Sequence, residues 1–514
     1  MRRRSGAGPG FYKPSLYRRR RRFVRPLIAL AAAAGIGAGA WVLTEGFGGI
    51  EPVVGQASPT PRWTPEPSPL PINRKVQGIT TFRGNAARSY LGRGPVPEDP
   101  IVLWRFPSDS SMCTETALVD GGTSNLYCGV GWTGQPNVVV RDGIMEVRFG
   151  ANDGDIHFLD GRTGGTTIPA IETGGLAKGS MTSDPEGYPL IYAGSTDGKF
   201  RAIAIDREFP EILWELDGTT SVPEPKWNDD WDGSPLVLGD HLLIGGENGW
   251  FYIVRLHRTY GEDGLVRVAP EVVVARRGWD DELLADIGDD EVSIENSIAF
   301  SEGIAYFANS AGLVQGWDVS DVLSGGTEVH RTFRFWMGDD VDATIVVDPD
   351  GYLYVASQVQ RGTARSALVG QLVKLDPRRP TDPIVWSRAF GTPGYDGQAG
   401  IWGTPALSDG VLYVPTNAGE IFAIDAGTGQ PLWKRQLNPP TWSSPVVVDG
   451  VLIQGDCLGF LTAWDVADRA APPTLLWKVR VSSGCLEATP IVWKGWIFIG
   501  DRTGGFYGLS DAGA

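Results

Sequence analysis

The sequence predicts an all-β fold, an eight-bladed β-propeller with four-stranded blades, and three observations support it. A unit of about 50 residues recurs eight times, which is the period of a propeller blade. The chain holds 69 Gly, 37 Pro and 19 Trp, a composition typical of short strands joined by turns. An isolated strand-like segment, Ile101 to Phe106, precedes the first unit and can complete the last one.

The clearest unit runs from Gly403 to Trp433. A Pro-led strand, a turn at Asp409-Gly410, two further alternating apolar segments and a Thr-Gly turn at Thr428-Gly429 follow one another. Alternating apolar residues separated by Gly turns predict a meander of antiparallel strands. Copies of this unit begin at Gln135, Ser180, Ser234, Ser297, Thr344, Gly403, Ser444 and Thr489.

The last copy ends at Leu509 without its fourth strand and its Trp. The segment Ile101 to Phe106 carries a Leu-Trp pair of the kind that ends the other copies. If this segment becomes the missing strand, the ring closes and no sheet edge stays open. We therefore expect a propeller over residues 78–514, closed by an N-terminal strand.

The N-terminus has the pattern of a targeting segment. Residues 1–26 are basic, with five arginines at residues 18–22, and an apolar stretch rich in Ala and Gly follows. This order indicates a signal peptide or a signal anchor, with the N-terminus in the cytoplasm and the body outside it. Ala38-Gly39-Ala40 offers a cleavage site, but we expect retention, with residues 27–50 as a single transmembrane helix. Residues 51–77 are Pro-rich and predict a semi-extended linker.

Charge excludes one class of partner. The first 25 residues hold ten Lys or Arg and no acid, which leaves 35 basic against 61 acidic residues in the remainder. Such a body repels nucleic acid and attracts cations or basic partners. The alternative is that the acidic residues only keep a large surface soluble.

The segment Ala423 to Trp433 resembles the tryptophan-docking repeat of quinoprotein (pyrroloquinoline quinone, PQQ) dehydrogenases and their non-enzymatic relatives. Asp160 to Gly164 is similar but shorter, and the resemblance extends over about residues 82–510. It implies that the Trp of each repeat packs flat between neighbouring blades. The repeat is specific for the fold and says little about the cofactor, because many proteins that contain it resemble assembly scaffolds.

Candidate site residues follow from aligning the repeats on the residue that opens each innermost strand. The position three residues earlier should face one mouth of the central channel. It varies among the copies, whereas a purely structural position would be uniform. In blade order it holds Thr133, Lys178, Asp232, Glu295, Asp342, Trp402, Trp442 and Glu487.

Converging carboxylates require a cation or protons, and Ca²⁺ prefers several oxygen ligands. The expected metal ligands are therefore Asp232, Glu295, Asn296, Asp342 and Glu487. Trp402, Trp442 and Lys178 are the expected residues for a planar cofactor. The arrangement resembles the calcium and quinone site of the dehydrogenases, which implies Ca²⁺ and PQQ as possible cofactors. The simpler alternative is a hydrated acidic funnel that Lys178 neutralises in part.

Other features argue against a dehydrogenase. The family enzymes resemble one another in a disulfide between adjacent cysteines, and no two Cys are adjacent here. Neither a CxxCH haem motif nor enough His for a zinc site or a His-based triad is present. The four Cys of an exported chain suggest two disulfides, and we expect the local pairs Cys113 with Cys128 and Cys457 with Cys485.

Three functions remain open. The favoured reading is a non-catalytic scaffold or binding module at the cell membrane, with another envelope or surface protein as partner. The second is a quinoprotein oxidoreductase that uses PQQ and Ca²⁺. The third is a carbohydrate or peptide binder whose exposed residues are Trp227, Trp231 and Trp279.

Overall fold

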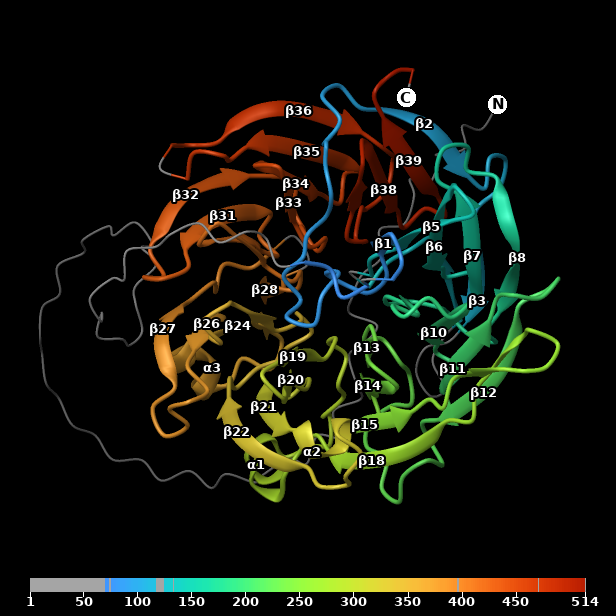
Figure 1. Ribbon diagram of the computed structural model, residues 1–514. Coiled ribbons are helices and arrows are strands. Elements are labelled where there is room, and N and C mark those ends of the chain that lie inside the picture. Colours follow the sequence, from blue (N-terminus) through green and yellow to red (C-terminus); the bar gives the residue numbers. More distant parts are fainter. Residues whose placement is uncertain are drawn as a thin grey trace, which may run out of the picture.

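Eight antiparallel sheets surround one axis like the blades of a propeller (Figure 1). The computed structural model describes residues 70–73, 75–116, 124–132, 134–394, 397–469 and 471–513. The eight-bladed, four-stranded architecture predicted from the repeats is thus confirmed. The cytoplasmic segment, the transmembrane helix and most of the linker predicted for residues 1–77 lie outside the described residues. Within the described part of the chain, no helix has the length and apolar character needed to cross a bilayer.

Blades 1 to 4 contain the first half of the ring, and each runs from the channel outward in chain order. Blade 1 has a fifth, innermost strand from the N-terminus. The strands are β1 (Gly78–Ile79), β5 (Asn137–Arg141), β6 (Ile144–Gly150), β7 (Asp155–Asp160) and β8 (Thr166–Glu172); β9 (Thr182–Ser183), β10 (Leu190–Gly194), β11 (Lys199–Ala204) and β12 (Glu211–Asp217); β13 (Leu236–Leu238), β14 (His241–Gly245), β15 (Trp250–Arg255) and β18 (Glu271–Arg277); β19 (Ala299–Ser301), β20 (Ile304–Phe307), β21 (Leu313–Asp318) and β22 (His330–Trp336).

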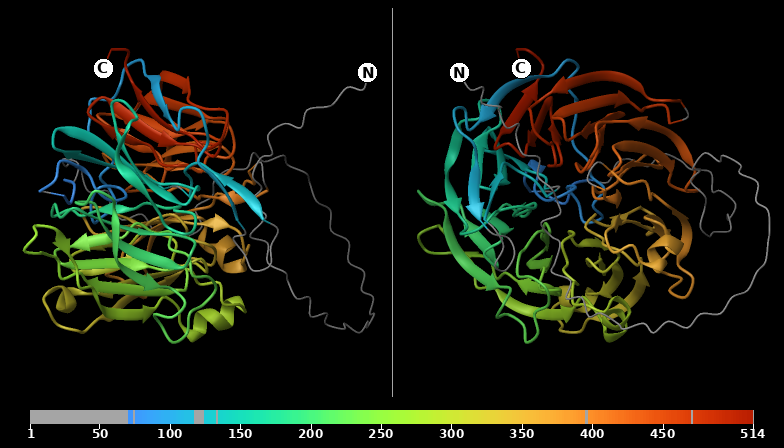
Figure 2. Two further views of the ribbon diagram at one scale, coloured as in Figure 1. Left: turned by 90° about the vertical axis from the view of Figure 1, so that its right-hand side faces the viewer. Right: turned by 180° about the vertical axis from the view of Figure 1, so that it is seen from behind.

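Blades 5 to 8 complete the ring in the same way (Figure 2). Their strands are β23 (Val346–Val347), β24 (Leu353–Ala356), β26 (Leu372–Leu375) and β27 (Ile384–Arg388); β29 (Ala406–Ser408), β30 (Val411–Pro415), β31 (Glu420–Asp425) and β32 (Pro431–Gln436); β33 (Val446–Val448), β34 (Val451–Gly455), β35 (Phe460–Asp465) and β36 (Thr474–Arg480); β37 (Ile491–Trp493), β38 (Trp496–Gly500), β39 (Phe506–Ser510) and β2 (Ile101–Phe106).

Smaller elements decorate the ring. Three two-stranded ribbons and three short helices lie in the connections between blade strands. They are β3 (Cys113–Thr116) with β4 (Asn125–Cys128), β16 (Thr259–Tyr260) with β17 (Val266–Arg267), β25 (Gln358–Val359) with β28 (Ala399–Gly400), α1 (Asp281–Ile287), α2 (Ser320–Leu323) and α3 (Ala364–Val369).

The turns show why the sequence folds into blades. Between β29 and β30, Asp409 and Gly410 both have positive φ, at 48° and 70°, and Ser408 pairs with Val411. A two-residue hairpin needs positive φ at both central residues, and Asp-Gly is a favoured solution. Side chains alternate along each strand, so the apolar ones pack between neighbouring blades. Phe149 of blade 1, for example, stacks on Phe506 of blade 8 with ring centroids 3.8 Å apart.

The N-terminal strand closes the ring as predicted. Strand β2 pairs antiparallel with β39, from Ile101 opposite Ser510 to Phe106 opposite Phe506. The last blade therefore takes its outermost strand from the start of the propeller and its other three strands from the end. Such closure removes the open edge that the last repeat would otherwise expose.

Tryptophans of the outermost strands dock on the next blade. Trp104 donates from Nε1 to the Gly161 carbonyl of blade 1 at 2.9 Å, and Trp386 of blade 5 donates to the Ala426 carbonyl of blade 6 at 3.1 Å. A Cβ on Gly164 or Gly429 would lie 2.7 Å or 2.5 Å from the docked indole. Both glycines also have positive φ. The Gly of the Thr-Gly turn therefore makes room for the Trp of the preceding blade.

Candidate functional site

Four of the predicted ring positions meet at one mouth of the central channel. Asp232, Glu295, Asp342 and Trp402 line a single pocket, together with Phe82 and Trp132. Each lies shortly before the innermost strand of its blade, so the pocket opens at the mouth where these strands begin. We call this the start mouth, and the opposite one, where the innermost strands end, the end mouth. Thr133 lies outside the described residues.

Lys178 is the basic residue at the centre of this site. Its Nζ lies 3.2 Å from Asp230 Oδ2, 3.0 Å from Asp232 Oδ2 and 3.4 Å from Glu247 Oε1. The same Nζ lies 4.1 Å from the centre of the Trp132 ring, a cation–π distance. Lys178 carries one positive charge and therefore neutralises only one of the three carboxylates.

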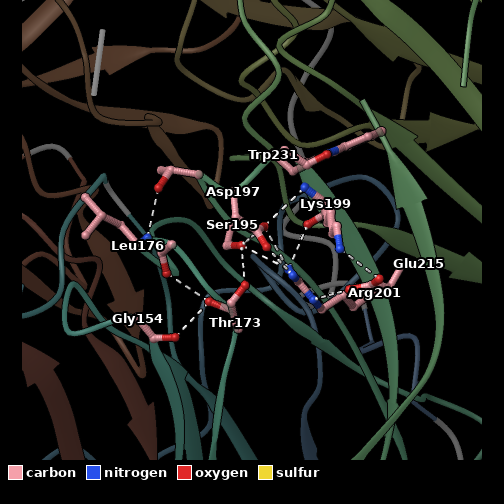
Figure 3. A network of polar contacts seen from close by, with 12 residues as sticks. Gly154, Thr173, Leu176, Ser195, Asp197, Lys199, Arg201, Glu215 and Trp231 are labelled. Carbon is pink, nitrogen blue, oxygen red and sulfur yellow. Dashed lines mark hydrogen bonds and ion pairs between the residues drawn. The ribbon is translucent and has the colours of Figure 1, made fainter. Parts of the chain in front are cut away.

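The loop that carries Lys178 is fixed by blade 2. Leu176 donates from its backbone nitrogen to Thr196 Oγ1 at 2.9 Å, and Thr196 donates back to the Leu176 carbonyl at 3.1 Å (Figure 3). Nearby, Trp231 Nε1 donates to the Gly198 carbonyl at 3.0 Å. These contacts hold the segments before β9 and before β13 against the same turn. Lys178 and Asp232 therefore meet in a preset geometry.

Acidic groups in the pocket outnumber their counter-charge. Oxygens of Asp232, Glu247 and Glu295 all lie within 4.8 Å of one another. Burial raises the pKa of Asp230 to about 7, of Asp232 to about 6 and of Glu247 to about 8, against the opposing effect of Lys178. These side chains are nearly inaccessible to solvent, so their charges are poorly screened.

A second group of acids adjoins the first. Burial raises the pKa of Glu295, Asp340 and Asp342 well above their usual ranges, and neighbouring carboxylates add to the shift. Asp342 Oδ2 accepts from Gln358 Nε2 at 2.5 Å. Its Oδ1, like Oδ1 of Asp232 and of Asp340, is buried and accepts no hydrogen bond from a donor among the described residues. Buried oxygens of this kind are costly unless a cation or a proton satisfies them.

We expect the chelator-treated protein to lose stability as the pH rises from about 5 to about 8. Unfolded Asp and Glu titrate near pH 4, whereas Asp230, Asp232 and Glu247 hold their protons to about 7, 6 and 8 in the fold. Between these values the folded state binds more protons than the unfolded state, so its stability falls with rising pH. Thermal unfolding across this range measures the slope, and Glu247→Gln should flatten it. A flat profile for the parent chain would contradict the burial of these acids.

Two tryptophans of the predicted ring pack against each other. Trp402 and Trp442 meet edge to face with centroids 4.9 Å apart, and Trp132 lies edge-on to Trp402 at 5.6 Å. Both predicted rings are buried and rest against the disulfide between Cys457 and Cys485. The indoles are therefore packed against one another, and of the two predicted rings Trp402 lines the pocket, beside Trp132.

The two disulfides expected from the sequence are formed. Cys113 pairs with Cys128 across the β3–β4 ribbon. Cys457 pairs with Cys485 and joins the β34–β35 turn of blade 7 to the segment that leads into blade 8. The second bond thus ties two neighbouring blades beneath the tryptophan cluster.

Removing this inter-blade disulfide should weaken the ring. We expect the Cys457→Ser/Cys485→Ser double variant to lose about 3 kcal/mol of unfolding free energy, because the bond closes a loop of 28 residues. Thermal unfolding of the variant, compared with that of Cys113→Ser/Cys128→Ser, measures the effect. Equal and negligible losses would show that neither bond restrains the fold.

Two predicted metal ligands, Asn296 and Glu487, bind other groups of the protein and lie outside the carboxylate cluster. Asn296 donates from Nδ2 to the carbonyls of Ala308 and Val341, at 2.9 and 2.8 Å, and its Oδ1 accepts from the Ala308 amide. Its amide ties the start of blade 4 to its neighbours and does not line the pocket. Glu487 accepts from the Trp132 amide at 2.6 Å and lies 3.4 Å from Arg502 Nε. It belongs to the opposite wall and does not join the carboxylate cluster.

The aromatic residues proposed for a carbohydrate site are placed differently from expectation. Trp231 and Trp279 are 2% and 3% exposed, because both pack inside the core around blade 3. The expectation that they are exposed is wrong. Trp227 is partly exposed and has a φ of 62°. Two of the three indoles therefore have no face available to a glycan.

The pocket fits a divalent cation better than it fits a quinone. Its donors are carboxylate oxygens, several of them buried without a hydrogen-bond donor, which is the ligand set of a hard cation. A planar cofactor needs an open indole face, whereas Trp402 and Trp442 are only 6% and 4% exposed. The residues present therefore do not fit PQQ.

Several residues in or beside the pocket could not be singled out from the repeat alignment. Glu247 lies in the turn between β14 and β15, and Asp340 lies two residues before the ring position of its blade. Phe82 comes from the N-terminal segment, which belongs to no repeat. The turn after each second strand returns to the start mouth, so an acid in that turn is the one signal that could have indicated Glu247.

Comparisons with known proteins give the same fold. A family model described as outer membrane protein assembly factor BamB matches residues 369–512. Quinoprotein alcohol dehydrogenase PedH of Pseudomonas putida is 29% identical over 131 residues, which cover 24% of this chain and 22% of PedH. BamB of Xanthomonas campestris is 27% identical over 128 residues, covering 23% of this chain and 30% of that protein. Each match thus spans less than a third of the relative.

Solved structures of similar shape are more distant in sequence. Quinohemoprotein alcohol dehydrogenase from Comamonas testosteroni superposes with a TM-score of 0.54 at 14% identity. The superposition covers 85% of this chain and 81% of that one. At this level of identity the likeness concerns the fold alone.

Proposed function

Because this chain is a β-propeller built from PQQ-like repeats, we propose that it is a non-catalytic binding scaffold whose acidic pocket holds a divalent cation. Anchored by its N-terminal segment, the propeller would stand outside the cytoplasm and present its surface to another envelope or surface protein. The matches to an assembly factor and to a dehydrogenase are each partial and do not distinguish between these two kinds of protein. The proposal therefore rests on the residues of the pocket.

One observation carries the proposal. The pocket keeps carboxylate oxygens without donors, while the two indoles expected to hold a quinone, Trp402 and Trp442, are buried against each other. A cation bound by Asp232, Glu247 and Glu295 would offset charges that Lys178 alone leaves uncompensated. A cation held there would stabilise the centre of the ring.

The test uses the purified full chain. Ca²⁺ and PQQ are titrated separately and together, binding is followed by Trp fluorescence, and dye reduction is measured with simple alcohols and sugars. We expect saturable binding of Ca²⁺, no effect of PQQ and no dye reduction. Tight, Ca²⁺-dependent binding of PQQ with turnover would overturn the proposal and make the pocket the active site of an oxidoreductase.

A further inference from the structure

The turn between β6 and β7, in blade 1, gathers three potential metal ligands outside the acidic pocket. Asp153 lies in this turn, Asp155 begins β7, and His157 follows on the same side of that strand. One ligand atom of each residue lies within 4.8 Å of the other two. His157 Nε2 lies 3.0 Å from Asp153 Oδ2, and the histidine side chain is only 8% exposed. The imidazole therefore points at the carboxylates from inside the blade.

The same turn of blade 2 contains fixed cations. The three corresponding positions there, between β10 and β11, hold Asp197, Lys199 and Arg201. Arg201 Nη1 donates to Asp197 Oδ1 at 3.0 Å, and Lys199 Nζ lies 3.1 Å from Glu215 Oε2 (Figure 3). Blade 1 keeps the first acid of this arrangement and replaces the two permanently charged side chains by an acid and a histidine. All three of its positions thus carry groups that can bind a metal ion.

Negative charge collects at this turn of blade 1. Asp155 lies directly opposite Glu172 of β8, whereas Lys199 lies opposite Asp217 at the same place in blade 2. Like charges at opposite cross-strand positions are destabilising. Burial, and next the carboxylate of Asp153, raise the pKa of Asp155. Among the described residues, no Lys or Arg forms an ion pair with Asp153 or Asp155. A bound cation would supply the positive charge that the side chains of blade 2 supply there.

Packing fixes the direction of the imidazole. The ring of His157 lies edge to face with Phe106, with centroids 5.2 Å apart, and is tilted against Phe149 at 5.3 Å. The Asp153 carbonyl accepts from Thr114 Oγ1 of the β3–β4 ribbon at 3.3 Å. Phe106 belongs to β2, the strand that closes the ring. The three ligands therefore lie in a preset geometry at the seam between blades 8 and 1.

We propose that Asp153, Asp155 and His157 bind a divalent transition-metal cation, Zn²⁺ or an ion of like preference, at the seam where the ring closes. Zn²⁺ binds imidazole nitrogen and carboxylate oxygen at about 2.0 to 2.2 Å, which places two tetrahedral ligands about 3.3 Å apart. The distances from His157 Nε2 to the two carboxylate oxygens of Asp153, 3.0 and 3.3 Å, match this spacing. The nitrogen ligand distinguishes this site from the acidic pocket, whose oxygen ligands favour Ca²⁺. The proposal therefore holds whether or not the pocket binds a cation.

Calorimetric titration of the chelator-treated full chain with Zn²⁺ tests the site. Millimolar Ca²⁺ and the Glu295→Gln/Asp342→Asn background keep the acidic pocket from contributing. We expect this background chain to bind one Zn²⁺. Asp155→Asn replaces a charged ligand by a neutral one of the same shape, so it should weaken Zn²⁺ binding by roughly tenfold or more. Asp155 is partly exposed, so this substitution leaves the packing of the blade unchanged.

His330→Gln is the matched control for the histidine ligand. His330 is exposed and lies opposite the single carboxylate of Asp318, so its replacement should leave the Zn²⁺ affinity unchanged. His157→Gln should weaken binding at least as much as Asp155→Asn does. Zn²⁺ should also raise the unfolding midpoint of the background chain and of neither ligand variant. Absence of Zn²⁺ binding by the background chain, or an unchanged affinity in Asp155→Asn, would overturn the proposal.

Discussion

Replacing Trp386 by Ala is expected to lower the free energy of unfolding by about 4 kcal/mol. The indole is buried between blades 5 and 6, donates to the Ala426 carbonyl and lies against Gly429. Truncation to Ala removes its apolar burial and leaves a cavity between two rigid sheets. It also removes one of three donors to this carbonyl, which still accepts from Tyr354 and Lys374. Thermal or denaturant unfolding of the full chain measures the loss.

Trp433 provides the control for this prediction. It occupies the equivalent position in blade 6 but is only partly buried, so its replacement by Ala should cost clearly less. Trp386→Phe, which keeps most of the ring and loses the donor, should fall between the parent and the Ala variant. Equal losses for Trp386→Ala and Trp433→Ala would show that docking on the next blade adds no stability.

Neutralising two pocket acids is expected to weaken divalent-cation binding by roughly 100-fold or more. The variant is Glu295→Gln/Asp342→Asn, which keeps the shape of both side chains and removes two of the charges that face the pocket. Hard cations depend on the number of charged oxygen ligands, so the loss should be large. Calorimetric titration of the chelator-treated chain with Ca²⁺ measures it.

Glu487→Gln is the matched control for the cation site. This acid occupies the same position of its repeat, but it contacts Arg502 and the Trp132 amide and stays outside the cluster. Its replacement should leave Ca²⁺ affinity within a factor of about three. Glu487 is not a ligand, so its charge attracts the cation only through a weak, longer-range Coulomb interaction. An equal fall in both variants would mean that Ca²⁺ responds to the overall acidity of the mouth.

The repeat pattern predicts the ring and part of its site for a clear physical reason. In a propeller every copy delivers the same sequence position to the same mouth, so a fixed offset from the strand-opening residue located Asp232, Glu295 and Asp342 together. The same offset carries no information on side-chain direction. Trp442, Asn296 and Glu487 share it or adjoin it, yet they face other walls.

The N-terminal segment, residues 78–93, and Glu247 show where such prediction ends. Residues 78–93 belong to no repeat, and their place in the channel follows from contacts with segments up to several hundred positions away, such as Arg83 with Thr404. Glu247 sits in a turn whose sequence reads like the other second turns of the repeat. Glu247 belongs to the acidic cluster because Lys178, from the previous blade, lies 3.4 Å from its Oε1.

The proposed function rests on a divalent cation held by the buried carboxylates at the start mouth. The most direct test is thermal unfolding of the chelator-treated full chain at pH 8, with and without millimolar Ca²⁺. We expect a rise in the midpoint, because a ligand that binds only the folded state stabilises it. The rise should be absent in Glu295→Gln/Asp342→Asn and preserved in Glu487→Gln. An unchanged midpoint in the parent chain would contradict the account and leave these acids as groups that keep their protons.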